Sequence, residues 1–472
     1  MNPQQLTFIP RYFTQKGIIV FFGLTIFLLL LYIQRIVPVQ WILFNLVEVV
    51  VFFYLSSKLS VRWAKVSTAL FARRLFQTSF FIRLGWVLFS YFFYTWMTGK
   101  PFEFQAADAA GYHGEAVWLA GLFDDHRWDV YAAYIGKNYS DMGYPTYLAA
   151  LYYLFGDGVL LPRLIKALMG GLTCLFVYRL ARNNFDESTG RMAGIMAMLV
   201  PNLIYYTGLH VKETEMVFLV VTFIYVADQV IRTRGIQFVR LLLLGTLGLL
   251  LFYFRTVLAA SLIGSVAVAA FLISGRISTG SKRMGLILLS AAGILFIAST
   301  PIGDNINEYI KASDQNQTSQ MGNFATRQDG SNKLASYGSR SIFLPFMLIV
   351  PLPTLVYIAD QPNAMMLAGA YFTRNIYAFF VFVALITLYK RKRLREHVLL
   401  LAVIFSYIFV LASSGFALSE RFHLPLIPFL LILAAYGVSQ MNRKNTKYYV
   451  PYLVFITLLV IGWNWFKVTG RS

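Results

Sequence analysis

Residues 108–115, Asp108-Ala109-Ala110-Gly111-Tyr112-His113-Gly114-Glu115, lie at the centre of a polar segment that runs from Lys100 to about Tyr147. This segment collects carboxylates, on Glu103, Asp108, Glu115, Asp124, Asp125, Asp129 and Asp141. Its basic residues are only Lys100, Arg127 and Lys137, although the whole chain has a formal net charge of +20. A solvated loop that tolerates acidic residues would explain the bias, and so would an active-site loop in which Asp108 is the working carboxylate.

Composition identifies lipid as the solvent of the rest of the chain. Hydrophobic residues make up 58% of the 472 positions and charged residues 13%, and the mean hydropathy is +0.62. A water-soluble domain could not hide so much apolar surface. The basic residues fall in short clusters between apolar runs, a pattern that indicates membrane topology and excludes a nucleic-acid binder. The single cysteine, Cys174, excludes an intrachain disulfide and a cysteine-based metal cluster.

The apolar runs predict an all-α polytopic membrane protein with about 13 transmembrane helices and interfacial helices in its outer loops. A helix needs about 20 residues to cross a bilayer core. The expected spans are residues 17–37, 39–56, 84–97, 159–181, 193–209, 214–231, 238–254, 257–273, 285–299, 367–389, 398–412, 424–438 and 450–466. Residues 144–155 are apolar but too short to span, and residues 342–353 are broken by three prolines, so both segments are expected to be interfacial or re-entrant.

The basic clusters orient these spans. With a cytoplasmic N-terminus, every inside loop is basic, as the positive-inside rule requires. These loops hold residues 58–83, Arg179, Arg182, Arg191, Arg232, Arg234, Arg276, Lys282, Arg283, residues 390–393, Arg443, Lys444 and Lys447. The acidic segment and a second polar segment, residues 302–341, then lie on the outer side. The first apolar run lacks a cleavage site, which favours a retained helix and a bacterial plasma membrane.

Polar residues at the outer ends of the spans are candidates for a site, because ionisable groups at membrane depth are costly and usually functional. The outer candidates are His210, Lys212, Glu213, Arg255, Arg340, Arg421 and His423. Their cations suit an anionic, lipid-linked substrate, since arginine binds phosphate bidentately. Lys166, Glu215 and Arg374 are interpreted as interfacial side chains that reach for the membrane surface. The two histidines are interpreted as hydrogen-bonding or interfacial residues, and their spacing does not match a metal site.

The order of these features resembles the GT-C superfamily of polytopic glycosyltransferases, whose members include protein O-mannosyltransferases and lipid A aminoarabinose transferases. The resemblance covers about residues 102–436 and is strongest over residues 108–227. It rests on Asp108 with Tyr112 and Ala116, on residues 143–148 and 155–157, on 162–168 with 177–182, on Leu199-Val200-Pro201 with Lys212-Glu213-Thr214, on Phe254-Arg255-Thr256 and on residues 421–428.

Roles follow from this resemblance. Asp108 takes the position of the family's loop carboxylate, a general base or an organiser of donor and acceptor, and Glu213 matches a recurrent acidic residue that opens a later helix. Arg255 and Arg421 match positions where cations meet the carrier phosphate. The remaining substrate-binding candidates are Tyr112, His113, Lys212, Arg340 and His423. Two features depart from the family: two spans precede the one that feeds the acidic segment, and Asp108 lacks an adjacent carboxylate, which leaves a divalent metal as an open question. No metal ligand and no other cofactor is assigned.

The apolar runs and the two polar segments divide the chain into five expected segments. Residues 1–98 carry N-terminal transmembrane helices and a basic cytoplasmic connector, and residues 99–158 form the outer catalytic loop with its interfacial helix. Residues 159–301 form a transmembrane core, residues 302–358 a second outer loop with a re-entrant segment, and residues 359–472 the C-terminal transmembrane helices.

The main hypothesis is an inverting membrane glycosyltransferase. It would move a sugar from a polyprenyl-phosphate-linked donor to a lipid, glycan or protein acceptor on the non-cytoplasmic side, with membrane lipids as its surroundings. A glycan polymerase or ligase that uses diphosphate-linked oligosaccharides is the nearest alternative. A lipid or solute transporter is a further alternative from another class, for which Glu48 is the main mid-span carboxylate.

Overall fold

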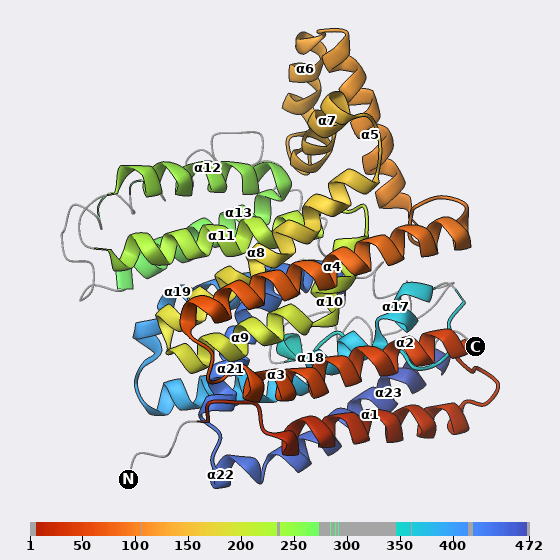
Figure 1. Cartoon of the computed structure of the whole chain (residues 1–472), viewed down its shortest axis with the longest axis vertical. Helices are drawn as coiled ribbons and strands as arrows, with labels where there is room; N and C mark the ends of the chain where they lie inside the picture. The colour runs from red at the N-terminus through yellow and green to blue at the C-terminus, as the bar shows by residue number, and fades with distance from the viewer. Residues whose placement is uncertain are drawn as a thin grey trace. The chain divides into compact units, whose positions relative to one another are not determined.

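The described chain is built from α-helices, as expected from the sequence. In this computed structural model the described residues are 6–272 except 105 and 234–236, the single residues 284, 288 and 291, and 346–469 except 360 and 414–418. Within these ranges the structure contains helices and short helical turns but no β-strand (Figure 1). The second polar segment, the expected span 285–299 (of which only residues 288 and 291 are described) and Arg340 lie outside the described residues.

The chain forms two compact units, each assembled from separate stretches. The first unit contains Met1–Phe71, Val177–Asn202 and Ala298–Ser472, and the second contains Ala72–Phe176 and Leu203–Ile297. This division by packing differs from the five consecutive segments expected from the sequence. Those segments stay a prediction about how function is distributed along the chain.

The first unit is organised around α21 (Ile427–Ser439). This helix packs against α9 (Glu187–Leu199), α18 (Ala368–Lys390) and α19 (Val398–Ser413). In an apolar window of 18 residues within residues 420–439, 94% of the residues are buried, compared with 33% in the corresponding window of α1. The other helices of this unit are α1 (Arg11–Leu31), α2 (Val39–Val50), α3 (Ser56–Arg62), α17 (Pro362–Met366), α20 (Glu420–His423), α22 (Arg443–Thr446) and α23 (Tyr449–Thr469), with π-helical η1 (Val51–Leu55) and 3-10 turns η4 (Leu394–His397) and η5 (Leu424–Leu426).

A glycine sets the close approach of α18 and α21. A Cβ atom added to Gly437 would lie 1.9 Å from the carbonyl oxygen of Phe380. Small residues allow helix backbones to approach within a membrane, where association depends on packing and hydrogen bonds rather than on the exclusion of water. The backbone contact at Gly437 therefore holds two central helices together.

Backbone N–H groups at the N-terminus of α18 donate to side chains of α2. The Gly369 N–H donates to Asn45 Oδ1 and the Ala370 N–H donates to Glu48 Oε2, both at 2.9 Å, while Asn45 Nδ2 donates to the Met365 carbonyl at 2.8 Å. The first N–H groups of a helix lack partners within the helix, and a carboxylate also suits the positive end of its dipole. Glu48, the residue on which a transporter would depend, thus has a structural role.

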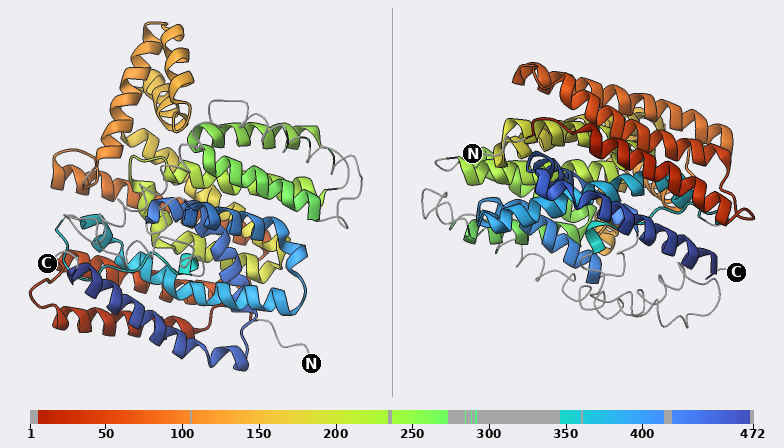
Figure 2. Two further views of the ribbon diagram at one scale, coloured as in Figure 1. Left: turned by 180° about the vertical axis from the view of Figure 1, so that it is seen from behind. Right: turned by 90° about the horizontal axis from the view of Figure 1, so that it is seen from below.

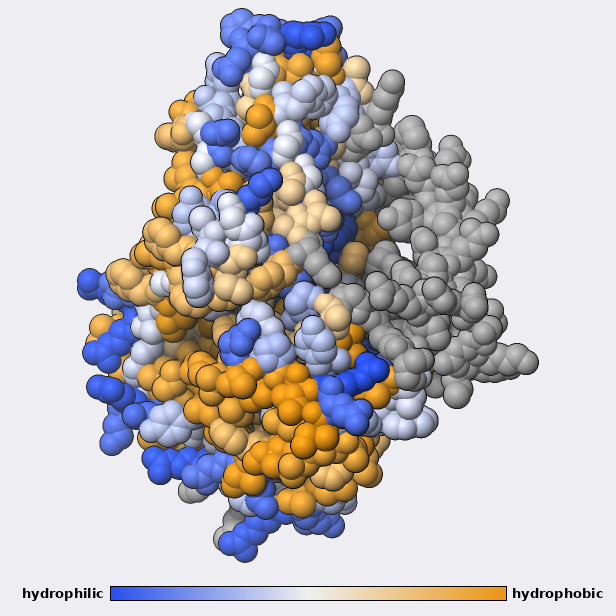
Figure 3. All heavy atoms as spheres, turned by 90° about the vertical axis from the view of Figure 1, so that its right-hand side faces the viewer, coloured by the Kyte–Doolittle hydropathy of each residue, from blue (hydrophilic) through white to orange (hydrophobic). Residues whose placement is uncertain are grey.

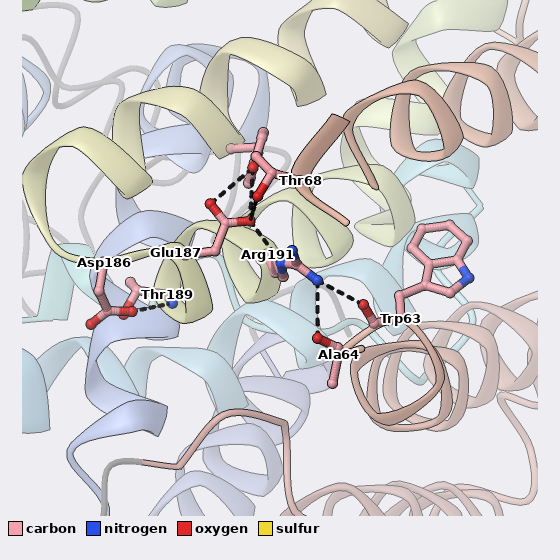
Figure 4. A network of polar contacts seen from close by, with 8 residues as sticks. Trp63, Ala64, Thr68, Asp186, Glu187, Thr189 and Arg191 are labelled. Atoms are coloured by element: carbon pink, nitrogen blue, oxygen red, sulfur yellow. Dashed lines mark hydrogen bonds and ion pairs between the residues drawn. The ribbon is translucent and has the colours of Figure 1, made fainter. Parts of the chain in front are cut away.

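At the start of α9, a polar cluster ties together stretches of the first unit (Figure 4). Arg191 Nε donates to Glu187 Oε1 at 2.7 Å, and Arg191 Nη1 donates to the carbonyls of Trp63 and Ala64 at 2.9 and 3.0 Å. The Thr189 N–H donates to the Asp186 carboxylate at 2.7 Å, which makes Asp186 the N-cap of α9. Arg191, predicted as part of a basic inside loop, therefore also holds the chain that follows α3.

The second unit contains two groups of helices. In one group, α5 (Ala107–Asp124) packs against α6 (Trp128–Asn138) and α7 (Gly143–Phe155). In the other group, three helices lie side by side, namely α11 (Glu213–Arg232), α12 (Phe238–Phe254) and α13 (Thr256–Leu272) (Figures 1 and 2). Helix α7 also contacts α12. The acidic segment is therefore folded into helices. The unit boundary falls within α4 (Thr68–Thr98), α8 (Leu160–Asn184) and α10 (Pro201–Tyr205), which is followed by the 3-10 turn η2 (Tyr206–Gly208).

Eight helices of the described chain are long and apolar enough to cross a membrane, and each overlaps an expected span. Two expected spans appear as apolar helices of 17 residues, α12 and α13. The count of 13 is not confirmed. The expected span 193–209 is wrong as a single helix, because α9 ends at extended Val200 before Pro201, and proline disfavours the helical conformation in the residue before it. The expected span 84–97 is only the second half of α4.

Many apolar side chains remain exposed, as expected for a protein with lipid around it. On α1, Ile19 and Leu30 are 67% and 70% exposed, whereas Phe21 and Leu28 are fully buried. On the face shown in Figure 3, hydrophobic residues cover a large connected area. Exposed patches of this extent are rare on water-soluble monomers. The protein is therefore integral to the membrane.

Gly437→Ala should destabilise the protein, because the new methyl group cannot fit against the Phe380 carbonyl without moving α18 from α21. Overpacking of this kind costs about 1–3 kcal/mol. The measurement is the thermal midpoint of the detergent-solubilised protein, followed by size-exclusion chromatography after heating. Gly462→Ala on α23 is the control, since a Cβ there meets nothing within 4 Å. Equal midpoints for the two variants would contradict this account.

Candidate functional site

The candidate site in the second unit surrounds residues 209–212, between η2 and α11. The ammonium of Lys166, on α8, donates to the Leu209 carbonyl at 2.8 Å and to the Val211 carbonyl. Leu209 is extended, so successive side chains in this loop point in different directions. Lys166 thereby fixes the backbone on both sides of His210 and just before Lys212.

Lys166 belongs to a buried ion pair. Its Nζ atom lies 3.5 Å from Glu215 Oε2 and 5.2 Å from the centre of the Tyr144 ring. Lys166 is 0% exposed and Glu215 is 2% exposed. The interpretation of these two side chains as interfacial is therefore wrong, and so is that of Arg374, which is also buried. A lone charge would be costly there, and the partner together with the two carbonyls offsets that cost.

Lys212 precedes α11 and faces a second set of groups. Its ammonium is paired with Asp141 and lies 3.4 Å from the carbonyl of Phe254, the last residue of α12. The Tyr112 ring centre is 5.8 Å away. Asp141 has a positive φ of 73°, a conformation that aspartate tolerates better than most residues. Asp141 is 54% exposed while Lys212 is buried. The ion pair therefore joins a carboxylate at the protein surface to an ammonium group in the interior.

Arg255 lies close enough to act electrostatically on Lys212. Burial lowers the pKa of Lys212, the Asp141 carboxylate opposes this, and the positive charge of Arg255 lowers the pKa further. Arg255 is the extended residue between α12 and α13 and is half-buried. Glu213, fully buried, occupies the first turn of α11, where the helix dipole favours a carboxylate. Two of the predicted cations and the predicted acidic residue thus belong to one neighbourhood.

Three polar rings form a chain beside this cluster. The Tyr152 hydroxyl lies 2.9 Å from His113 Nδ1 and 3.0 Å from His210 Nε2. Burial lowers the pKa of His210, as do the charges of Lys166 and Arg163, so this histidine is neutral. Burial also lowers the pKa of His113, against a smaller opposing effect of Asp157. The expectation that His210 forms hydrogen bonds is confirmed.

Asp108 lies on the exposed first turn of α5. Tyr112 follows four residues later, which places the two side chains on the same face of the helix. The Tyr112 ring packs edge-on against Tyr144 at 5.1 Å, and Tyr112 also adjoins Lys212. The structure therefore gives Asp108 an accessible position on the face of α5 that leads to the Lys212 cluster, while its chemical role stays a prediction.

The remaining candidates belong to the first unit. His423 is buried, and Arg374 Nη2 lies 2.8 Å from its Nδ1 atom. Arg421 is half-buried in the same short helix, α20. A convergence of Arg421 with Asp108 and Arg255 stays a prediction, because these residues lie in different units. Arg340 lies outside the described residues.

The described residues do not provide a divalent-metal site. Among them, no group of three or more histidine, cysteine, aspartate or glutamate side chains is placed to hold an ion. Around Lys212, the charges are two cations and the carboxylates of Asp141 and Glu213, whereas Mg²⁺ and Ca²⁺ prefer several oxygen ligands. No chemical step is assigned to a metal here.

Residues 143–302 match the family described as dolichyl-phosphate-mannose-protein mannosyltransferase. Over this stretch, the match agrees with the GT-C resemblance seen in the sequence. The matched stretch contains Lys166, His210, Lys212, Glu213 and Arg255 from the candidate site, whereas Asp108 precedes it.

One solved structure can be compared with this chain, the archaeal oligosaccharyltransferase AglB from Archaeoglobus fulgidus in complex with an inhibitory peptide and a dolichol-phosphate. The TM-score is 0.39 at 15% sequence identity, and the alignment covers 70% of this chain. It covers 48% of AglB, so the chain spans about half the length of that protein. No curated protein sequence matches the chain.

Sequence reasoning assigned no chemical role to Asp141, Tyr152 and His210. Asp141 was one of seven carboxylates in the acidic segment, and no signal in the sequence separates it from the others. Tyr152 lies in the apolar run 144–155, where an aromatic residue is usually interpreted as packing. His210 was among the outer candidates, but nothing in the sequence indicated that its partner would be Tyr152.

Lys166→Met should lower the free energy of unfolding by about 3–5 kcal/mol, because Glu215 is left as a buried charge without its partner. The measurement is the thermal midpoint in detergent, with exposed Lys58→Met as the control, which should stay within about 0.5 kcal/mol of the parent. Adding Glu215→Gln to Lys166→Met should restore part of the loss. A single variant as stable as the parent would show that the pair is dispensable.

Proposed function

We propose that the protein is an integral membrane glycosyltransferase that transfers a sugar from a polyprenyl-phosphate-linked donor to an acceptor hydroxyl or amine. The observation that carries this proposal is the pair of cations Lys212 and Arg255, which act on one another inside the stretch that matches the mannosyltransferase family. A lipid-linked phosphate is an anion delivered at membrane depth. Positive charges held at the ends of α11 and α12 provide a complementary surface.

The proposed chemistry is a single displacement at the anomeric carbon. The acceptor oxygen or nitrogen forms the new bond to that carbon while the bond to the phosphate oxygen breaks, which inverts the configuration. Asp108 takes the proton of the acceptor, and the carrier leaves as a phosphate whose negative charge Lys212 and Arg255 stabilise. Arg421 is proposed as a further cation for the carrier. Tyr112 and His113 contact the substrate from α5.

The donor phosphate competes with an internal anion in this proposal. Asp141 occupies one side of the Lys212 ammonium, and its exposed position allows it to withdraw when phosphate arrives. Lys212 therefore keeps a negatively charged neighbour before and after transfer. That arrangement avoids the cost of leaving a buried ammonium without a partner.

We place the site on the non-cytoplasmic side of a bacterial plasma membrane, with a cytoplasmic N-terminus. The support is the distribution of basic residues, which falls on the opposite side from the acidic segment throughout the chain. The acceptor class, whether lipid, glycan or protein, is the subject of the assay.

Asp108→Asn should reduce turnover by about 10²–10⁴-fold, the usual contribution of a positioned general base. The assay follows sugar transfer from radiolabelled polyprenyl-phosphate sugars to lipid, glycan and peptide acceptors, using purified protein in detergent. Asp129→Asn, in the exposed first turn of α6, is the matched control and should retain the parent rate. Near-normal turnover of a folded Asp108→Asn protein would remove Asp108 from this role.

Lys212→Met should weaken the binding of polyprenyl phosphate by about 10–100-fold, because a charge-assisted contact contributes about 1.5–3 kcal/mol. Binding of undecaprenyl phosphate is measured directly, without a transfer step. Lys100→Met, on an exposed side chain near the start of the acidic segment, is the control. Equal dissociation constants for both variants would exclude Lys212 from the phosphate site, and uptake of substrate into proteoliposomes without product would favour a transporter.

A further inference from the structure

The chain of rings His113, Tyr152 and His210 constrains where its protons lie. The Tyr152 hydroxyl is within hydrogen-bond distance of one nitrogen from each histidine. Burial raises the pKa of Tyr152, so the hydroxyl keeps its proton. A phenol has one proton to donate. If both histidines donated to its oxygen, this proton would have no acceptor among the described residues. Two arrangements therefore remain, in which Tyr152 donates to one histidine and accepts an N–H from the other.

The surroundings of His210 distinguish these arrangements. Its second nitrogen, Nδ1, is buried and has no hydrogen-bond partner among the described residues. If Tyr152 donated to His210 Nε2, the proton of neutral His210 would lie on Nδ1 as a buried N–H without an acceptor. Orphaned buried donors are rarer in proteins than orphaned acceptors. The favoured arrangement has His210 Nε2–H donating to the Tyr152 oxygen.

The same choice determines the state of His113. Once His210 donates to Tyr152, the Tyr152 proton points to His113 Nδ1, which accepts it. The proton of neutral His113 then lies on Nε2, because a neutral imidazole has one donor and one acceptor nitrogen. His113 Nε2 makes no hydrogen bond to a described residue and is not among the buried polar atoms, so it can reach a ligand.

The charged groups that act on the two histidines do not disturb this assignment. Lys166 and Arg163 act on His210 and oppose its protonation, while Asp157 acts on His113. The Phe102 ring contacts both imidazoles, at 5.6 and 5.9 Å, and Tyr144 contacts His210 at 6.1 Å. These apolar and aromatic contacts hold the rings in place. Tyr144 also packs on Tyr112, which joins the chain of rings to the Lys212 cluster.

We propose that His210 and Tyr152 are positioning residues that fix His113 as its Nε2–H tautomer, so that His113 meets the substrate as a neutral hydrogen-bond donor. The group that it recognises is an oxygen acceptor, which the lipid-linked phosphate or a sugar hydroxyl can supply. His113 is then unable to take a proton through Nε2, which leaves Asp108 as the base. The recognition of substrate rests on the proposed function, whereas the tautomer does not.

The tautomer is read directly by nuclear magnetic resonance of full-length protein labelled with ¹⁵N at histidine and reconstituted in lipid. The chain has five histidines, and the spectra of His113→Gln and His210→Gln assign the two signals. Both histidines should be protonated at Nε2, with unprotonated Nδ1. A proton on Nδ1 of His113 in the parent protein would overturn the proposal.

Tyr152→Phe tests the coupling, because phenylalanine keeps the ring and removes only the hydroxyl. The signals of both His113 and His210 should change, while His397, in the first unit, serves as the control and should not. Unchanged His113 and His210 signals would also overturn the proposal. Should this variant fail to fold, the parent spectrum still decides, since it reports the tautomer without a substitution.

Substrate recognition has its own test. Undecaprenyl phosphate and octyl mannoside are titrated separately while the His113 Nε2 signal is followed, and the probe that shifts it identifies phosphate or sugar as the source of the acceptor. A shift with neither probe would contradict the recognition step. In the transfer assay, His113→Gln keeps an N–H donor whereas His113→Glu offers only acceptors, so the glutamate variant should be at least about tenfold less active than the glutamine variant. If the parent protein transferred no sugar in the assay while its spectrum showed His113 protonated at Nε2, the proposed function would be contradicted and the tautomer would not.

Discussion

The hydrogen bonds from Lys166 to the carbonyls of residues 209 and 211 are the constraint on which the candidate site depends. An ammonium group in the protein interior needs several acceptors, and the loop before α11 supplies two of them while Glu215 supplies a charge. Because the backbone of this loop is held at two points, the side chains of His210 and Lys212 point in different directions. One histidine reaches Tyr152 and one lysine reaches Asp141. A single buried charge therefore organises two different polar clusters.

Much of the fold could be predicted from the sequence because lipid is a demanding solvent. A spanning segment must satisfy its own backbone hydrogen bonds, so an apolar run of sufficient length has few alternatives to a helix. Eight expected spans were confirmed on this basis. The failures have local causes. Pro201 ends α9 where the apolar run continues. Helix α4 begins at Thr68, and three basic residues of the expected connector, Arg73, Arg74 and Arg83, lie on it.

The candidate site was less predictable because its residues come from segments far apart in the sequence, and their contacts cannot be read from the sequence alone. Lys212, Glu213, Arg255, Tyr112 and His113 were found from their residue types and from the GT-C resemblance, and the structure places them in one unit. Lys166 and Glu215 were misjudged, since a charged residue near the end of a span is usually close to the membrane surface. Only the packing of α8 against the loop shows that this pair is internal. Asp141 and Tyr152 carry no distinguishing pattern at all.

Helix α21 is enclosed on nearly all sides, yet its sequence is as apolar as that of the lipid-facing helices. Hydropathy therefore cannot distinguish a helix at the centre of the first unit from one at its edge. Among the described helices, α9, α18 and α19 pack against α21, and these three precede it in the chain. During synthesis from the N-terminus, the neighbours of α21 are made first. The apolar surface of α21 then has two roles. It drives insertion of the helix from the translocation machinery into the bilayer, and it later packs between the three helices made before it.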